Sequence, residues 1–159
     1  MLMENIFGMV VFGSSIVLLF LTVPWQRIKE FALLGLIAGV LLAVILVHIM
    51  QNLLGVWIFH RADFTVFGIP VFLSLAWTPL EIFFAHFLSN YRNILLIIGI
   101  ILALPLGATF LHFLMLENKM LTYHHWNLMW TFLFSLAIHL GIAYYIYATG
   151  KIKTPVTGS

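Results

Sequence analysis

Residues 93–116 read NILLIIGIILALPLGATFLHFLML, a stretch that contains no Asp, Glu, Lys or Arg. A helix that crosses the hydrocarbon core of a bilayer needs about 20 consecutive apolar residues. A helix of this length on the surface of a soluble protein would carry a charged face toward water, and this stretch has none. It therefore predicts a transmembrane helix.

The rest of the chain repeats this pattern. The 159 residues are 64% hydrophobic and 8% charged, whereas a soluble domain carries about 25% charged residues. We therefore predict an all-α fold, a polytopic membrane bundle of about five transmembrane helices. The helical domain is expected over residues 1–149, followed by a polar cytoplasmic tail over 150–159. The spans are expected at 5–23, 31–50, 67–88, 93–116 and 126–148.

The connections between these spans are short and polar, except for residues 51–66. That segment mixes Trp57, Phe59 and Phe64 with polar and charged side chains, which is typical of chain that lies in the headgroup region. The first apolar stretch lacks the basic start and the small-residue cleavage site of a signal peptide, so we expect it to be retained as a helix. Cysteine is absent, which excludes disulfides and thiolate metal sites.

Positive charge is distributed unevenly between the two sides of the predicted bundle. In multi-pass proteins Lys and Arg accumulate in the cytoplasmic loops. We therefore predict a cell-membrane protein with its N-terminus outside and its C-terminus in the cytoplasm. One side carries Arg27, Lys29, Arg92, Lys151 and Lys153, and the other carries Arg61 and Lys119.

Small residues recur every four positions in two of the predicted spans. Such stripes let helix backbones approach closely in a membrane, where lipid provides no hydrophobic force between helices. We interpret both stripes as packing faces within the chain, and contact between two copies of the chain is the alternative. The stripes are Gly35, Gly39 and Ala43 in the second span, and Gly99, Ala103 and Gly107 in the fourth.

Glu81 is the most informative residue, because a carboxyl group inside a span is costly and is usually functional. Pro79 precedes it and frees a backbone carbonyl one turn earlier. Ser74, Thr78 and Glu81 recur at helical spacing and share one face, which Trp77 borders. An acid at this depth is expected to stay protonated unless a cation pairs with it.

A second polar stripe follows the fifth span, where Asn127, Thr131, Ser135 and His139 recur at intervals of four. His139, at the end of this stripe nearer the cytoplasm, is expected at a depth in the membrane comparable with that of Glu81. One interpretation is a structural Glu–His hydrogen bond between two helices, and the other is a proton donor that faces a cavity. The candidate catalytic residues are Glu81 and His139, and the candidate substrate-binding residues are Ser74, Trp77, Thr78 and Ser135.

Several histidines fall toward the predicted outer side, and two of them lie near the outer ends of spans. His48 and His112 are weak candidates for ligands of a haem or a metal ion. Their spacing matches no established ligand motif, so we expect no metal and no cofactor. Motifs for zinc proteases, serine hydrolases and nucleotide binding are missing from the sequence.

Three short stretches carry a family resemblance: GVWIF at 55–59, GIPV at 68–71 and PLEIFF at 79–84. In this order they resemble the lycopene cyclase domain of bacterial and fungal carotenoid enzymes. The resemblance implies a carboxyl group, here that of Glu81, that protonates a terminal double bond. The second acid of the family's signature is Ile82 in this chain. The acid expected shortly before the first stretch is also absent.

The leading hypothesis is a small integral membrane protein that binds a membrane lipid or another apolar, isoprenoid-like molecule. Its enzymatic form isomerises or cyclises that molecule with Glu81 as an intramembrane acid. The alternatives are a non-enzymatic membrane subunit or assembly factor, and a haem- or metal-binding protein that uses the outer histidines. No basic run indicates nucleic acid. A homo-oligomer and a larger membrane complex are both open as partners.

Overall fold

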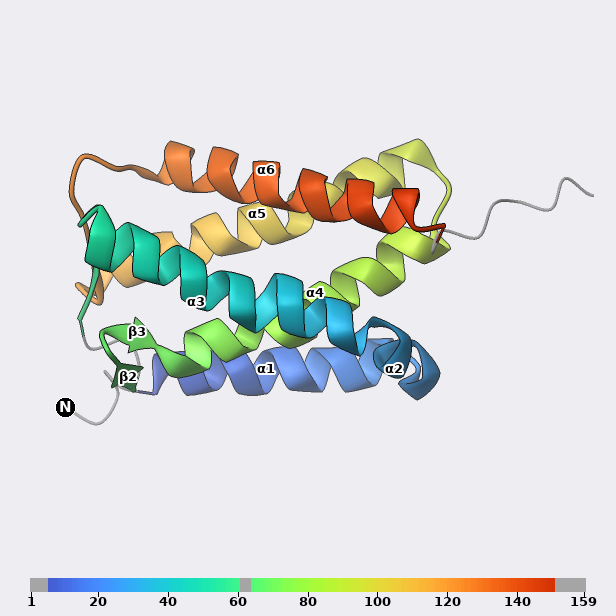
Figure 1. The fold of residues 1–159 in the computed structure, drawn as a ribbon, viewed down its shortest axis with the longest axis horizontal. Helices are drawn as coiled ribbons and strands as arrows, with labels where there is room; N and C mark the ends of the chain where they lie inside the picture. Colours follow the sequence, from blue (N-terminus) through green and yellow to red (C-terminus); the bar gives the residue numbers. More distant parts are fainter. Residues whose placement is uncertain (1–5, 61–63, 151–159) are drawn as a thin grey trace, which may run out of the picture.

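The structure is a computed structural model, and it describes residues 6–60 and 64–150. Within these residues it is a bundle of five helical rods (Figure 1). This confirms the predicted all-α class. The rods are α1 (Phe7–Thr22), a continuous helix Trp25–Leu53, α4 (Val71–Asn90), α5 (Ile94–Glu117) and α6 (Leu128–Ala148).

Four of these helices, all except α1, are long and apolar enough to cross a membrane. Each has a segment of high mean hydropathy with almost no charge. The chain is therefore an integral membrane protein. The first rod is apolar but has only 16 residues, which corresponds to about 24 Å of helix against a hydrocarbon core of about 30 Å. The predicted first span is thus shorter than expected within the described residues.

The second helix starts earlier than the sequence suggested. We predicted a polar loop before residue 31, but the helix begins at Trp25 directly after Pro24. Gln, Arg, Lys and Glu are good helix formers, so the polar residues continue the helix instead of interrupting it. The rod comprises α2 (Trp25–Leu34), the π-helical η2 (Gly35–Leu41), α3 (Leu42–Val47) and the π-helical η3 (His48–Leu53).

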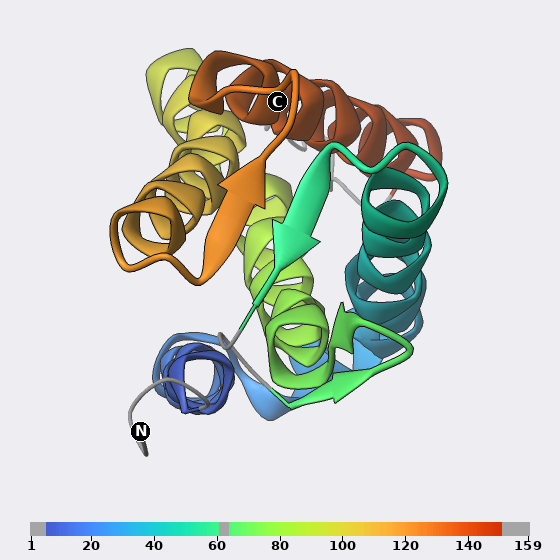
Figure 2. The ribbon, with the colours of Figure 1, turned by 90° about the vertical axis from the view of Figure 1, so that its left-hand side faces the viewer.

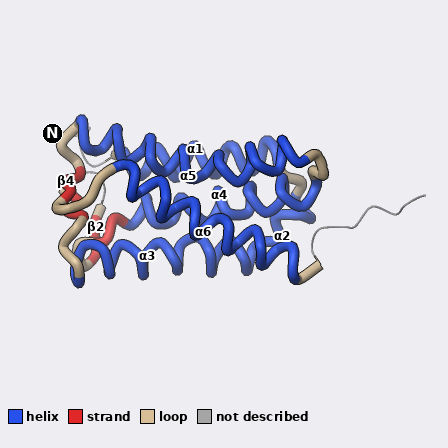
Figure 3. The backbone as a smooth tube through the Cα atoms, turned by 90° about the horizontal axis from the view of Figure 1, so that it is seen from above, coloured by secondary structure: helices blue, strands red, loops and turns tan. Residues whose placement is uncertain are grey.

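Helix α4 lies at the centre of the bundle. It packs against α1, the second helix, α5 and α6, and the end-on view shows it between the others (Figure 2). The helices run along a common long axis (Figure 3). The face of α4 that carries Glu81 is therefore enclosed by protein and not by lipid.

Two pairs of short strands close one end of the bundle, which we call the strand end. β1 (Trp57–Phe59) pairs antiparallel with β4 (Leu121–Tyr123), so that Trp57 lies opposite Tyr123. β2 (Thr65–Val66) pairs with β3 (Ile69–Pro70) around a turn at Gly68, where φ is 78°. Figure 2 shows β1 and β4 side by side across this end.

The sequence did not predict these strands, and Trp57 is buried inside the protein. The position of residues 51–66 in the headgroup region stays a prediction. The side chain of Gln51 holds this connection in place, since it donates to the carbonyl of Gly68 at 2.7 Å and accepts from the N–H of Phe59 at 3.0 Å. Arg61 and Asp63, on which part of that prediction rested, lie outside the described residues.

The small residues of the second span form a close crossing with α4. A Cβ atom added at Gly39 would lie 2.6 Å from Cα of Thr78. One added at Gly35 would lie 2.5 Å from a side-chain carbon of Ile82. Both distances are too short for a real contact, so only glycine allows this approach. The predicted packing face in the second span is confirmed.

The corresponding prediction for the fourth span is wrong. Gly99, Ala103 and Gly107 are exposed on α5. A Cβ at either glycine would meet no atom within 4 Å. The two stripes have the same spacing, but within the described residues only the first packs tightly against another helix, whereas Gly99 and Ala103 border an open hollow beside Phe83 and Phe87 of α4. The alternative interpretation of the second stripe, a contact between two copies, stays a prediction.

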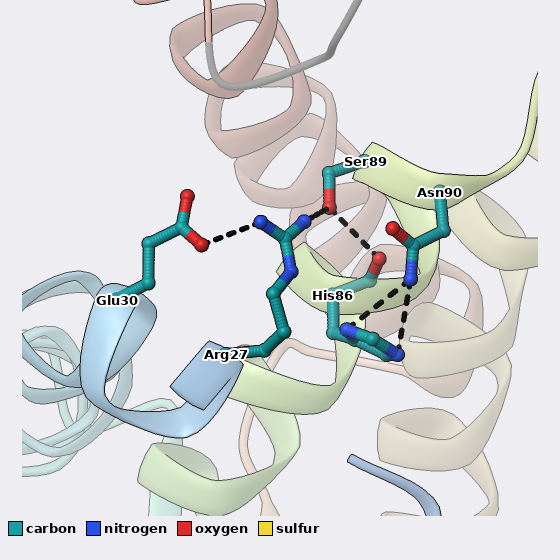
Figure 4. Close-up of polar contacts among 5 residues, drawn as sticks. All are labelled: Arg27, Glu30, His86, Ser89 and Asn90. Atoms are coloured by element: carbon teal, nitrogen blue, oxygen red, sulfur yellow. Dashed lines mark hydrogen bonds and ion pairs between the residues drawn. The ribbon is translucent and has the colours of Figure 1, made fainter. Parts of the chain in front are cut away.

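The opposite end of the bundle is held by a cluster around Arg27 (Figure 4). Its guanidinium group donates to the carboxylate of Glu30 and to the hydroxyl of Ser89 at the end of α4. The Ser89 hydroxyl donates to the carbonyl of His86 at 2.9 Å, and the amide of Asn90 lies 3.1 Å from Nε2 of the His86 ring. The start of the second helix is thereby tied to the end of α4. Lys151 and Lys153, two of the charges counted for orientation, lie outside the described residues.

Candidate functional site

A cavity of about 110 Å³ lies inside the bundle beneath the strand end. The second helix, α4, α5 and α6 all contribute to its wall, which is mainly aliphatic and aromatic. A few polar groups interrupt this apolar wall, a combination typical of sites for small apolar molecules. Apart from the indole N–H groups, these polar residues are Ser74, Glu81, His112, Thr131, Ser135 and His139.

Glu81 and His139 meet at the inner end of this cavity. Nε2 of His139 lies 3.1 Å from Oε1 of Glu81. The two residues are 1% and 2% exposed, so neither side chain is solvated by bulk water. The distance is that of an ion pair, although the ring nitrogen is not oriented for a regular hydrogen bond. The predicted contact between α4 and α6 is confirmed.

The surroundings of His139 decide which ring nitrogen carries a proton. Its Nδ1 lies 2.7 Å from the backbone carbonyl of Ser135, and a carbonyl can only accept a hydrogen bond. Nδ1 therefore carries a hydrogen, and Nε2 faces the carboxyl group of Glu81. A single proton then belongs to the pair, either on Glu81 with a neutral ring or on His139 with a carboxylate.

The second carboxyl oxygen of Glu81 has no such partner. Oε2 is buried and forms no hydrogen bond with any residue that the structure describes. A buried oxygen without a donor is unusual and costs about 1–3 kcal/mol. Because one oxygen contacts His139 and the other is unpaired, Glu81 is only half satisfied by the protein.

The other candidate residues are not all placed at this cavity. Trp77 and Ser135 line it, and the Trp77 ring lies 6.1 Å from that of His139. Ser74 also lines it, but its hydroxyl already donates to the carbonyl of Pro70 at 2.7 Å. Thr78 is turned toward the second helix and accepts from the N–H of Val40 at 3.3 Å. Thr78 therefore holds two helices together and does not line the cavity.

A second polar network lies toward the strand end of the cavity, and the sequence did not reveal it. The hydroxyl of Tyr123 lies 2.6 Å from Nδ1 of His112 and 2.6 Å from the hydroxyl of Thr131. The indole N–H of Trp126 donates to the same Thr131 oxygen at 2.9 Å. Burial raises the pKa of Tyr123 to about 12, so its hydroxyl keeps its proton. This network joins β4 to α5 and α6.

The two histidines considered for a metal or haem have separate partners. Nδ1 of His112 is bound to Tyr123, whereas His48 is exposed and contacts the amide of Asn52 at 3.0 Å. Within residues 6–60 and 64–150, no group of three or more His, Asp or Glu side chains is arranged to hold a metal ion.

No protein-family model matches the chain, and neither a curated protein nor a solved structure is significantly similar to it. The resemblance to the lycopene cyclase domain therefore stays a prediction.

Proposed function

We propose that this protein binds the end of an isoprenoid-like apolar chain in the cavity and uses Glu81 as an intramembrane acid toward it. The observation that carries the proposal is the half-satisfied carboxyl group of Glu81, buried beside an apolar cavity. A carboxyl group kept only to join two helices would gain from a second partner, and Oε2 has none within the described part of the chain. An unused oxygen at a cavity suits a group that acts on a bound molecule.

The size of the cavity restricts the ligand. A volume of about 110 Å³ holds several water molecules or a short piece of narrow chain. Most of a long ligand would then remain among the helices or in the lipid. A linear polyene or prenyl chain that inserts one end meets this requirement.

The proposed reaction is a redox-neutral isomerisation started by a proton. The Glu81 carboxyl adds its proton to one carbon of a terminal double bond, and the positive charge forms on the neighbouring carbon. The ring of Trp77, which lines the cavity, attracts such a cation. A proton then leaves a carbon next to the charge and returns to Glu81, with His139 able to hold it in transit. Cyclisation differs only in that a second double bond attacks the cation first.

Filling the cavity tests the binding step. Ala108 of α5 lies on the cavity wall and is buried, so Ala108→Leu should occupy the space without breaking a polar contact. We expect apolar material to co-purify with the wild-type protein in detergent and to be lost at least tenfold from the variant, as measured by mass spectrometry and absorption. Ala137→Leu, at an exposed position of α6, is the matched control and should retain it. Equal amounts in all three proteins, or none in the wild type, would contradict the proposal.

We further propose that the protein lies in a cell membrane, with the Arg27 end in the cytoplasm. The corner before α2 and the α4–α5 turn lie at one end, and the α5–α6 connection lies at the other (Figure 1). A single cysteine at exposed Lys119 should react with an impermeant thiol reagent in intact cells, while one at Lys29 should react only after lysis. The chain has no cysteine of its own, so the background is low. Labelling at Lys29 in sealed cells would reverse the orientation.

A further inference from the structure

The indole N–H of Trp57 is a buried donor whose acceptor is missing from the described chain. The side chain is 6% exposed, and Nε1 has no hydrogen-bond partner in residues 6–60 and 64–150. Trp57 lines the cavity at the strand end. Buried N–H groups are almost always paired in folded proteins, so an unpaired one indicates an acceptor that residues 6–60 and 64–150 do not supply.

The ring of Trp57 is fixed in this position. It makes edge-on contacts with the rings of His112 at 5.0 Å and Trp126 at 5.9 Å. Its backbone belongs to the β1–β4 ladder, where it lies opposite Tyr123. Rotating the Trp57 side chain to bring Nε1 to another acceptor would break these contacts.

The two hydroxyl groups at this end of the cavity, those of Tyr123 and Thr131, already have hydrogen-bond partners. The hydroxyl of Tyr123 bridges His112 and Thr131. The hydroxyl oxygen of Thr131 already receives the indole N–H of Trp126. Neither hydroxyl is therefore the partner of the Trp57 donor, whose residue lines the cavity.

We propose that the bound chain carries an oxygen acceptor, as a hydroxyl, carbonyl or ether group, and that Nε1 of Trp57 donates to it. This inference rests on the proposed function and specifies the chemistry of its ligand. Thr131, beside the Trp57 end, and His139, beside Glu81, are about 12 Å apart along α6. An oxygen held by Trp57 thus sets how far the apolar part of the chain reaches toward Glu81.

Farnesol and farnesene test this proposal, because they share an isoprenoid chain and only the first carries an oxygen. Binding of each tritiated compound is measured on the full chain in detergent micelles, for the wild type and for Trp57→Phe. Phenylalanine keeps an aromatic ring but has no N–H. We expect Trp57→Phe to weaken farnesol binding about fivefold, as for the loss of one neutral hydrogen bond, and to leave farnesene binding unchanged. Trp130→Phe, at an exposed tryptophan of α6, is the control and should change neither.

Indole NMR on ¹⁵N-tryptophan-labelled wild-type protein provides a second readout that needs no folded variant. The Trp57 N–H resonance should move downfield with farnesol and not with farnesene. If both compounds bind and this resonance responds equally to both, the donor is served by water and the inference is wrong, while the proposed function stands. If neither compound binds, the proposed function fails and the inference fails with it.

Discussion

Replacing Gly39 by alanine will destabilise the bundle by about 2 kcal/mol or more, the cost typical of overpacking at a tight contact. The added methyl group would lie 2.6 Å from the backbone of Thr78. Backbone cannot move aside as a flexible side chain can, so the second helix and α4 must separate. That separation also breaks the hydrogen bond from the Val40 N–H to Thr78. Thermal unfolding in detergent measures the loss.

Gly99→Ala is the matched control for this experiment. It makes the same chemical change in another membrane helix, at a position where the new Cβ meets nothing within 4 Å. Alanine is the better helix former by about 1 kcal/mol, so this variant should melt at the wild-type temperature or above it. If Gly39→Ala melts like Gly99→Ala, the close crossing between the second helix and α4 does not exist.

Replacing Glu81 by glutamine will abolish proton transfer in a protein that still folds. Glutamine has nearly the same shape and can donate or accept at the His139 ring, but its amide is not an acid at the pH of a cell. The readout is deuterium uptake by a linear isoprenoid chain incubated with the protein in heavy water. Each proton-initiated isomerisation places a solvent-derived hydrogen on carbon, so the product of the wild type should gain mass. The product of Glu81→Gln should not.

Glu81→Leu separates the structural contribution from the chemical one. Leucine leaves Nε2 of His139 without its partner in a buried position, which should cost roughly 1–3 kcal/mol in thermal stability. The glutamine variant should lose far less, because it keeps a polar partner for the ring. If glutamine and wild type take up deuterium equally, the acid role of Glu81 is wrong. A wild type that takes up none leaves only a structural role for the pair.

Hydropathy was sufficient to predict the class of fold and the approximate positions of the long helices. It was not sufficient for the ends of those helices, since polar helix formers after Pro24 extend the second helix to Trp25. It also could not distinguish the two small-residue stripes. The spacing of small residues shows that one face of a helix has no bulky side chains. It does not show whether another helix packs against that face. Gly39 has such a neighbour within the described chain and Gly99 has none.

The polar site was partly predictable for a similar reason. Glu81 and His139 lie at matching depths on two helices, and a buried acid requires a partner, so their contact followed from the topology. The network of Tyr123, His112 and Thr131 could not be predicted in this way. Tyr123 is placed by the pairing of two three-residue strands that are far apart in sequence, and no local pattern announces such a pairing. The π-helical turn that presents the Val40 N–H to Thr78 could not be predicted from the sequence either.

The pairing of β1 with β4 has a consequence for biosynthesis. The strand that β1 needs emerges from the ribosome only after α4 and α5, because β4 follows both in the chain. Until then the edge of β1 has unpaired backbone groups, which water must satisfy. Two hydrophobic helices are therefore inserted before this end of the molecule closes. The indole of Trp57, which the finished ladder buries, becomes sheltered from solvent among the last parts of the protein.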